Sequence, residues 1–294
     1  MKHKPLFAIL GVVAIAAGII VWQNQALREP VIRGEGLSFW LGNYGSGAED
    51  YKLVLAEMDA RCVRYLIREL DWKPKPAPGK LQSFLPDFLA RFFFPEGRPD
   101  HRAQALHILG KLGSLSKPAI PSLRKLAHDP VNSSGSNDWW VQGAAMATLI
   151  LLGDESLDSC IDQLLDPKNH DWKVAWWTTV CLRTNAASAV PRLAQTFHAS
   201  NDQEFRGRIA FPLRVIHSNP ELSVPILKSL LSHEDKSVRY QAIVGLKSFG
   251  AEAKSALPEL TALLQSDPSH RDVLTNAIAE INPASREVKP SEPK

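Results

Sequence analysis

The stretch DKSVRYQAIVGLKSFGAEAKSALPELTALLQSDP, residues 235–268, decides the fold. Its first half has small or apolar residues at helical spacing and ends at Gly250, a typical helix stop. Its second half has leucines at the same spacing, and it ends before Pro268 because a residue that precedes proline is pushed out of the α region. Two such helices form an antiparallel hairpin that cannot bury its apolar faces alone. The stretch therefore predicts a helical repeat with neighbours of the same kind.

Similar hairpins recur along the chain, and they predict an all-α fold. Pro225 follows Pro191 by 34 residues and Pro258 follows Pro225 by 33, and a period in this range indicates an α-solenoid. We expect about five to six helix pairs. The remaining predicted hairpins are His101–Gly113 with Ala119–His128, Trp139–Gly153 with Leu157–Leu165, Trp172–Thr184 with Ala189–His198, Phe205–His217 with Leu222–Ser232, and a closing half repeat, Arg271–Ile281.

Two residue types recur at fixed places in these hairpins. A proline is expected early in the second helix, where its missing N–H has no partner in any case. An aspartate stands three residues before an apolar position of the first helix, where its side chain can cap the helix. The prolines are Pro121, Pro191, Pro225 and Pro258, and the aspartates are Asp138, Asp171, Asp202 and Asp235.

The pattern of residues 235–258 resembles the consensus of HEAT repeats, in the short variety also called PBS-lyase-like. Asp235, the pair Val238-Arg239, Ala242, Gly250 and Pro258 carry the resemblance. It covers residues 100–283 well and residues 37–70 as a degenerate first repeat. The resemblance implies ladders between an aspartate and an arginine of adjacent repeats. The matching arginines are Arg102, Arg206 and Arg239, whereas Gln142 and Ala175 interrupt the series.

The N-terminus predicts a membrane anchor. Residues 5–22 carry no charge, follow Lys2 and Lys4, and are just long enough to span a bilayer as a helix. Basic residues before the span favour a cytoplasmic N-terminus, with the array outside the cytoplasm. The alternative is a cleaved signal peptide, because Ala14-Ile15-Ala16 resembles a cleavage site. With the anchor, the chain resembles bacterial membrane-anchored HEAT-repeat proteins, which implies a single-pass protein on the periplasmic side.

The expected organisation has a linker, an interrupted array and a tail. An insertion contains an apolar stripe over residues 80–94, which either packs on the first repeat or lies as an interfacial helix on the bilayer. The tail is charged, bears prolines and is expected to be disordered. The predicted segments are the signal anchor at 1–22, the linker at 23–36, the HEAT-like solenoid at 37–283 with a degenerate repeat at 37–70, the insertion at 71–99 and regular repeats at 100–283, and the tail at 284–294.

Five tryptophans crowd the starts of two neighbouring first helices. They fill gaps left by small neighbours such as Gly143, or they form an aromatic patch that contacts a partner, since tryptophan is enriched at binding hot spots. Adjacent helical residues point about 100° apart, so Trp176 and Trp177 cannot both face the core centre. The five are Trp139, Trp140, Trp172, Trp176 and Trp177.

The sequence predicts a scaffold and not an enzyme. It contains no metal-binding or nucleophile motif, so we expect no catalytic residues, no metal and no cofactor, and a net charge of +3 is too small to indicate a nucleic-acid partner. Three cysteines, far apart, are interpreted as core residues. We expect a membrane-tethered scaffold whose concave surface, lined by second helices, binds a protein or peptide. The alternative is a lyase-like or chaperone-like protein that handles a cofactor in an aromatic-lined groove.

Overall fold

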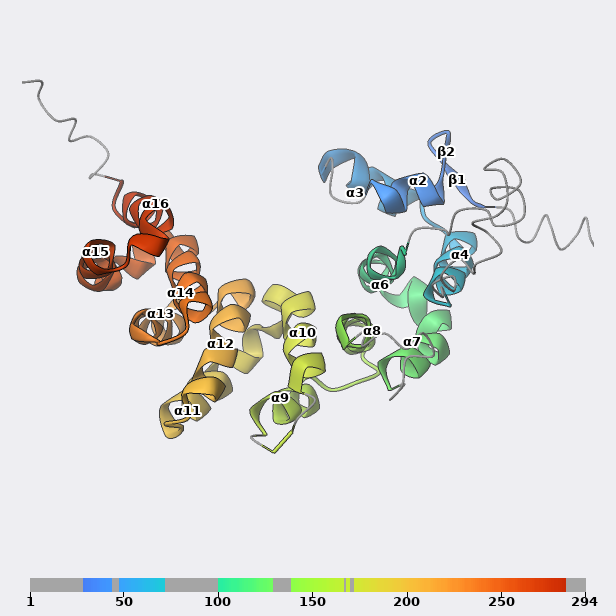
Figure 1. Ribbon diagram of the computed structural model, residues 1–294. Coiled ribbons are helices and arrows are strands. Elements are labelled where there is room, and N and C mark those ends of the chain that lie inside the picture. Colours follow the sequence, from blue (N-terminus) through green and yellow to red (C-terminus); the bar gives the residue numbers. More distant parts are fainter. Residues whose placement is uncertain are drawn as a thin grey trace, which may run out of the picture. The chain divides into compact units, whose positions relative to one another are not determined.

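The computed structural model describes residues 29–43, 48–71, 100–128, 139–166, 168–169 and 172–283 (Figure 1). The predicted anchor, the insertion from residue 72 onward and the tail lie outside these residues. Within the described ranges, no helix combines the length and the apolar composition that a bilayer crossing requires. The chain divides between Ser122 and Leu123 into two compact units.

The described part of the first unit begins with a short β-hairpin at a place where the sequence predicts a polar linker. Strands β1 (Val31–Ile32) and β2 (Glu35–Gly36) pair antiparallel. The turn residues Arg33 and Gly34 both have positive φ, 53° and 86°, as a type I′ turn requires. Ile32 is buried, which ties the hairpin to the folded part. The described end of the linker is therefore structured.

Helices make up most of the remaining residues that the structure describes in the first unit. Asp59 caps α4 by accepting hydrogen bonds from the backbone N–H groups of Arg61 and Cys62. Helix α4 then packs against α6 and the 3₁₀ segment η2. The elements are α2 (Leu37–Gly42), α3 (Ala48–Glu57), α4 (Ala60–Leu70), α6 (Arg102–Lys111), η2 (Gly113–Ala119) and α7 (Ile120–Ala127), in which the boundary between the units falls.

The second unit is a stack of helical hairpins, which confirms the predicted helical repeat. Its first helices are α8 (Trp139–Leu151), α10 (Trp172–Leu182), α12 (Gln203–Ile216), α14 (Lys236–Phe249) and α16 (Arg271–Ile281). Its second helices are α9 (Leu157–Leu165), α11 (Val190–Ala199), α13 (Pro220–Ser229) and α15 (Leu257–Ser266). Short 3₁₀ segments η4 (Leu230–Ser232) and η6 (Pro268–His270) follow α13 and α15. One core runs without a break from Ala147 to Ile281.

Several links between paired helices are 3₁₀ segments of seven residues, which the sequence does not predict. They are η2, η3 (Arg183–Ala189) and η5 (Gly250–Ala256). Each begins with a residue of positive φ, namely Gly113, Arg183 or Gly250. Arg183 has a Cβ, so this conformation costs roughly 1–2 kcal/mol there. The α12–α13 link is different, because it turns through His217 and Asn219, both with positive φ.

The first and second helices form two layers, and the first-helix layer is the more tightly packed. Each first helix from α8 to α16 packs closely against the next first helix. Among the second helices α9, α11, α13 and α15, close packing of this kind is found between α11 and α13. Glycines permit this: a Cβ on Gly143 would lie 2.8 Å from the Val174 carbonyl oxygen, and one on Gly207 would lie 3.0 Å from Val238 Cγ2. The closer layer takes the inner side of the bend within this unit (Figure 1). First helices therefore line the inner side, in place of the second helices that the sequence leads us to expect.

Candidate protein-binding surface

The structure brings four of the five singled-out tryptophans together in the first-helix layer. Trp139 on α8 has its ring centroid 6.2 Å from that of Trp176 and 5.7 Å from that of Trp177, both on α10. Trp172, one turn before Trp176, is 6.4 Å from it in a T-shaped arrangement. All of these side chains are half-buried. They form one aromatic cluster that bridges α8 and α10.

Trp177 lies at the contact between α8 and α10. Its Cβ would be 2.9 Å from a Cβ added at Gly143, so the glycine makes room for the tryptophan backbone. This geometry agrees with the packing interpretation for Trp177. Trp140, also half-buried, follows Trp139 on α8.

Trp176 points in the other direction, from α10 towards α12. Its indole Nε1 donates a hydrogen bond of 3.0 Å to the carbonyl oxygen of Arg208. Its ring is stacked on Phe211, with centroids 5.1 Å apart and planes at 26°. A buried indole N–H with an acceptor and a stacked partner is held in one orientation. Trp176 therefore extends the aromatic cluster from α10 onto α12.

Two arginines of α12 stack on these rings. The Arg208 guanidinium lies 4.5 Å from the centroid of Trp172, and that of Arg214 lies 4.5 Å from the centroid of Phe211. Such cation–π contacts are strengthened by removal from water. Arg208 has a side chain that is only 12% exposed, and its Nη2 donates to Glu204 Oε1 at 2.7 Å. Its Nε and Nη1 are buried without a hydrogen-bond partner.

Tyr240 continues this surface onto α14. Its side chain is 43% exposed, and its ring lies 6.2 Å from that of His270. Tyr240 is also close enough to interact electrostatically with Arg214. We call the connected set the aromatic–arginine surface; its members are Trp172, Trp176, Arg208, Phe211, Arg214 and Tyr240.

The sequence analysis finds the tryptophans of this surface but misses its α12 residues. Arg208, Phe211 and Arg214 are spaced by three, and residues three apart lie on the same helical face. An arginine–aromatic–arginine spacing beside the tryptophans is therefore the signal that would have identified them.

The predicted capping aspartates act as expected where the structure describes them. Asp202 accepts hydrogen bonds from the N–H groups of Glu204 and Phe205 at the start of α12, and Asp235 accepts one from Ser237 at the start of α14. Asp138 and Asp171 lie outside the described residues.

The predicted aspartate–arginine ladder is present between the last two repeats. Arg239 Nη2 lies 2.9 Å from Asp267 Oδ2, and Arg239 Nη1 also donates to the carbonyl oxygens of His233 and Glu234. The other arginines behave differently. Arg206 stacks on Phe197, at 4.4 Å from the ring centroid, with its Nε buried and unpartnered, and Arg102 pairs with Asp100, two residues before it.

Asp267 is the ladder residue that the sequence analysis takes only as a helix end. It follows Asp235 by 32 residues, close to the repeat period, which is the signal that identifies it. Its carboxylate accepts hydrogen bonds from the Ser269 hydroxyl, from His270 and from Arg239. These hydrogen bonds hold the pKa of Asp267 well below its usual range.

Three of the four singled-out prolines occupy the expected position. Pro121, Pro191 and Pro258 are the second residues of α7, α11 and α15. Pro225 is instead the sixth residue of α13, because Pro220 begins that helix two residues before the predicted start. A helix can start at proline since the fixed φ suits its first turn, and this displaces Pro225 into the interior.

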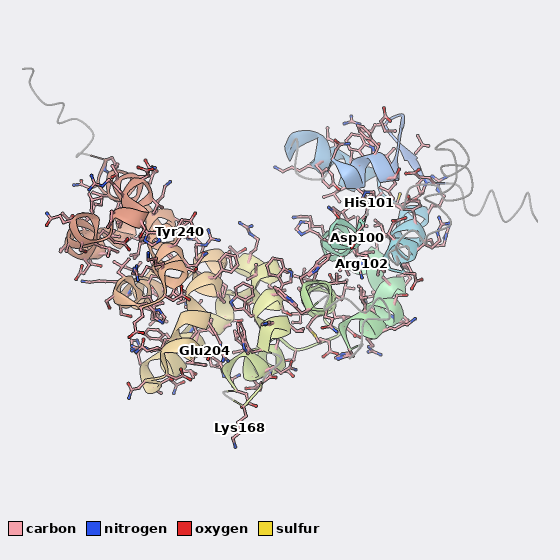
Figure 2. The ribbon with its side chains drawn as sticks, viewed as in Figure 1. Asp100, His101, Arg102, Lys168, Glu204 and Tyr240 are labelled. Carbon is pink, nitrogen blue, oxygen red and sulfur yellow. The ribbon has the colours of Figure 1, made fainter. Side chains whose placement is uncertain are left out.

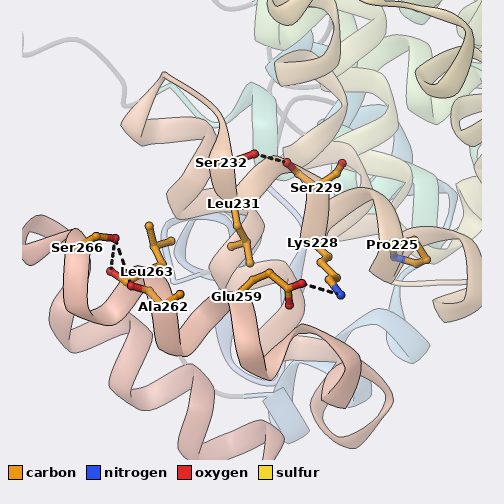
Figure 3. Close-up of a pocket in the computed structure, with 9 residues that line it drawn as sticks. All are labelled: Pro225, Lys228, Ser229, Leu231, Ser232, Glu259, Ala262, Leu263 and Ser266. Atoms are coloured by element: carbon orange, nitrogen blue, oxygen red, sulfur yellow. Dashed lines mark hydrogen bonds and ion pairs between the residues drawn. The ribbon is translucent and has the colours of Figure 1, made fainter.

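The second-helix layer contains a groove between α13 and α15 (Figure 3). Its volume is about 530 Å³, and an ion pair of 2.8 Å between Lys228 and Glu259 borders it. A smaller cavity of about 240 Å³ lies beside Arg206 and His233. Neither of these two cavities, which fall within residues 203–266, has a Phe, Tyr or Trp residue in its lining. Over the described ranges, no cluster of three His, Cys, Asp or Glu side chains is placed to hold a metal.

Comparison with known families identifies the repeat. The model of the family described as HEAT repeats matches residues 190–282, which run from α11 to the end of α16. A search of curated proteins finds no match.

Proposed function

Residues 190–282 of this chain are HEAT repeats, and on that premise we propose that the protein is a membrane-tethered scaffold that binds a protein or peptide partner. HEAT repeats commonly mediate protein interactions, and stacked repeats offer an extended surface for a partner. We assign the binding to the array, the tethering to residues 5–22 and no catalysis to the protein itself. The array then lies outside the cytoplasm, on the periplasmic side of a bacterial membrane.

The aromatic–arginine surface is the observation that carries the binding proposal. It combines tryptophan, tyrosine and arginine, the residue types that dominate interface hot spots. Its residues belong to α10, α12 and α14, helices of the layer on the inner side of the bend (Figure 1), where a bound chain contacts several repeats at once. Half-buried rings held by neighbours also lose little conformational freedom on binding, which favours affinity.

The cofactor-handling alternative has less support. It requires a groove lined by aromatic side chains, and the groove between α13 and α15 is lined by aliphatic and polar residues such as Pro225, Leu231 and Ser266.

A site-specific photo-crosslinker tests the binding proposal. We would place p-benzoylphenylalanine at Tyr240, in the aromatic–arginine surface, and at Phe39 on α2 as a control of similar exposure, 43% against 47%. After irradiation of intact membranes, the Tyr240 protein should give one discrete adduct with another polypeptide and the Phe39 protein none. No adduct at Tyr240, or the same adducts at both positions, would refute the proposed surface.

Reporter fusions test the tether. An enzyme that is active only outside the cytoplasm, fused after Pro283, should be active, and it should sediment with membranes unless residues 5–22 are deleted. Activity of a cytoplasmic reporter alone would contradict the orientation. An N-terminus found near Ala17 by Edman sequencing would show a cleaved signal peptide in place of an anchor.

A further inference from the structure

The first helices from α8 to α14 are basic and the second helices from α9 to α15 are slightly acidic, although the whole chain is close to neutral. The first helices from α8 to α14 hold one acidic residue, Glu204, whereas the second helices hold more acidic than basic residues. The basic residues of those first helices are Lys173, Arg206, Arg208, Arg214, Lys236, Arg239 and Lys247. The charged residues of the second helices are Asp158, Asp162, Arg192, Glu221, Lys228 and Glu259. The net charge of +3 therefore hides a basic first-helix layer.

Part of this positive charge has no counter-charge in the protein. Among the described residues, no carboxylate lies within ion-pair distance of Arg214 or of the exposed Arg183 at the start of η3. Burial lowers the pKa of the Arg214 guanidinium, Arg183 lowers it further as a like charge, and Tyr240 acts in the opposite direction. The Nε of Arg214 and two nitrogens of Arg208 are buried out of reach of a ligand, so an anion can meet these arginines only at their remaining guanidinium nitrogens. An anion that pairs with an arginine beside a half-buried aromatic surface forms a stronger hydrogen-bonded ion pair than it would form in open water.

Glu204 is the carboxylate that pairs with Arg208 at this surface, and it can be exchanged. Its side chain is 74% exposed, while that of its partner Arg208 is 12% exposed. The Glu204 end of the pair lies in water and the Arg208 end is largely buried, so exchanging one carboxylate for another keeps the buried charge paired. A carboxylate from a partner could therefore replace Glu204 on Arg208 at low cost.

We propose, building on the scaffold function, that the aromatic–arginine surface together with Arg183 docks an acidic polypeptide segment. Carboxylates of that segment pair with Arg183, Arg208 and Arg214, and its apolar side chains lie against the rims of Trp172, Trp176 and Phe211. Arginine forks match carboxylates, and the rings supply the apolar contact. Figure 2 labels Tyr240, a member of this surface on α14, and Glu204, the partner of Arg208 on α12.

The ring geometry favours a polypeptide over a single-stranded nucleic acid. Proteins hold unpaired bases by stacking them on free aromatic faces. Here Arg208 covers a face of Trp172, Arg214 covers a face of Phe211, and Trp176 and Phe211 cover each other. The rims stay available to side chains, whereas bases would have to break these stacks first.

Fluorescence anisotropy with labelled peptides tests the proposal on the full-length protein. The probe is a 12-residue peptide rich in Glu with two Phe; its controls are the same peptide with Gln for Glu, the same peptide with Lys for Glu, and a 12-nucleotide single-stranded DNA. The acidic peptide should bind, more weakly as salt rises, while the Gln and Lys peptides should bind at least about tenfold more weakly. No binding of the acidic peptide, equal binding of the Gln peptide, or tighter binding of the DNA would overturn the proposal.

Charge-removing variants locate the site. Arg214→Gln and Arg183→Gln should each weaken binding of the acidic peptide about tenfold, and Glu204→Gln should strengthen it by a few fold because Arg208 is freed. Arg192→Gln, which removes an equal charge from the second-helix layer, should leave the affinity within about twofold. Circular dichroism of each variant must show the wild-type helical signal. Where a variant loses this helical signal, the peptide affinity of Arg214→Lys, which keeps the charge, is compared with that of Arg214→Gln at a temperature at which both variants are folded.

The outcomes separate this inference from the scaffold function. Equal affinity of wild type, Arg214→Gln and Arg183→Gln would overturn the acidic-segment surface. An adduct at Tyr240 in membranes, unaffected by the same two substitutions, would leave the scaffold function standing and refute only the charge-based recognition.

Discussion

The contact between α8 and α10 depends on the absence of a side chain at Gly143, and Gly143→Ala tests this dependence. A Cβ at this position would lie 2.8 Å from the Val174 carbonyl oxygen and 2.9 Å from Trp177 Cβ. Both obstacles belong to the backbone or its first side-chain atom, so they cannot move without α10 moving. The substitution therefore has to separate the two helices.

Two opposing terms set the size of the effect. Alanine favours a helix over glycine by about 1 kcal/mol. Insertion of a methyl group into a tightly packed interface costs about 1–3 kcal/mol, and the upper part of that range applies because the clash is with backbone. We expect Gly143→Ala to lower the free energy of unfolding by about 1–2 kcal/mol.

Gly245→Ala provides the matched control in the same layer. Its added Cβ would meet Leu227 Cδ1 at 2.9 Å, and this is the end of a side chain that can rotate away. The helix term and the packing term then nearly cancel. Gly245→Ala should change the free energy of unfolding by less than about 0.5 kcal/mol.

Urea unfolding followed by circular dichroism measures both variants against the wild type. A repeat array can unfold in parts, so hydrogen exchange of α8 and α10 should accompany it and show faster exchange in Gly143→Ala only. The packing argument fails if Gly143→Ala is as stable as the wild type, or if Gly245→Ala is destabilised to the same extent.

Three further predictions concern the core, the ladder and the cysteines. Leu246→Asp should lower the free energy of unfolding by more than about 3 kcal/mol because it buries an unpaired charge, whereas the exposed Lys236→Asp should not; equal urea midpoints would show that the core assignment is wrong. The depressed pKa of Asp267 means that its stabilisation is complete above about pH 5 and is lost as the pH falls below about 4, so Asp267→Asn should flatten the acid limb of stability; an unchanged limb would exclude this role. Cys160 is buried and Cys181 is half-buried, and burial raises the pKa of both thiols to about 12, so both should react only slowly with iodoacetamide at pH 8 until the chain is unfolded; rapid labelling of the native protein would contradict the raised pKa.

The helices were predictable because the residues that start, line and end each helix lie close together in the sequence. Apolar spacing, Gly250 and the recurring aspartates set their positions, and predicted and observed boundaries agree closely from α6 to α16. The β-hairpin at residues 31–36 was not predictable in the same way. Its strands are two residues long, so only the turn Arg33-Gly34 carries a signal.

The candidate surface was only partly predictable. The tryptophans are easy to recognise in the sequence, but the direction in which each one packs depends on the neighbouring helix. Trp177 packs against Gly143 of α8, and Trp176 stacks on Phe211 of α12. The charge of the surface was hidden, since basic and acidic residues cancel in the total and separate only once the layers form. Which helix layer lies on the inner side of the bend likewise depends on the spacing between neighbouring helices, and the sequence of a single repeat does not contain that information.

The unequal packing of the two layers gives the array one stiff side and one compliant side. A change in the curvature of the second unit strains the first-helix contacts least when the first-helix layer keeps its length and the distances between second helices change. At the α13–α15 groove, the second helices are bridged by the ion pair between Lys228 and Glu259. Such a stack bends about its more tightly packed layer. The inner side of this unit can thus change its radius while its residues keep their order along the chain.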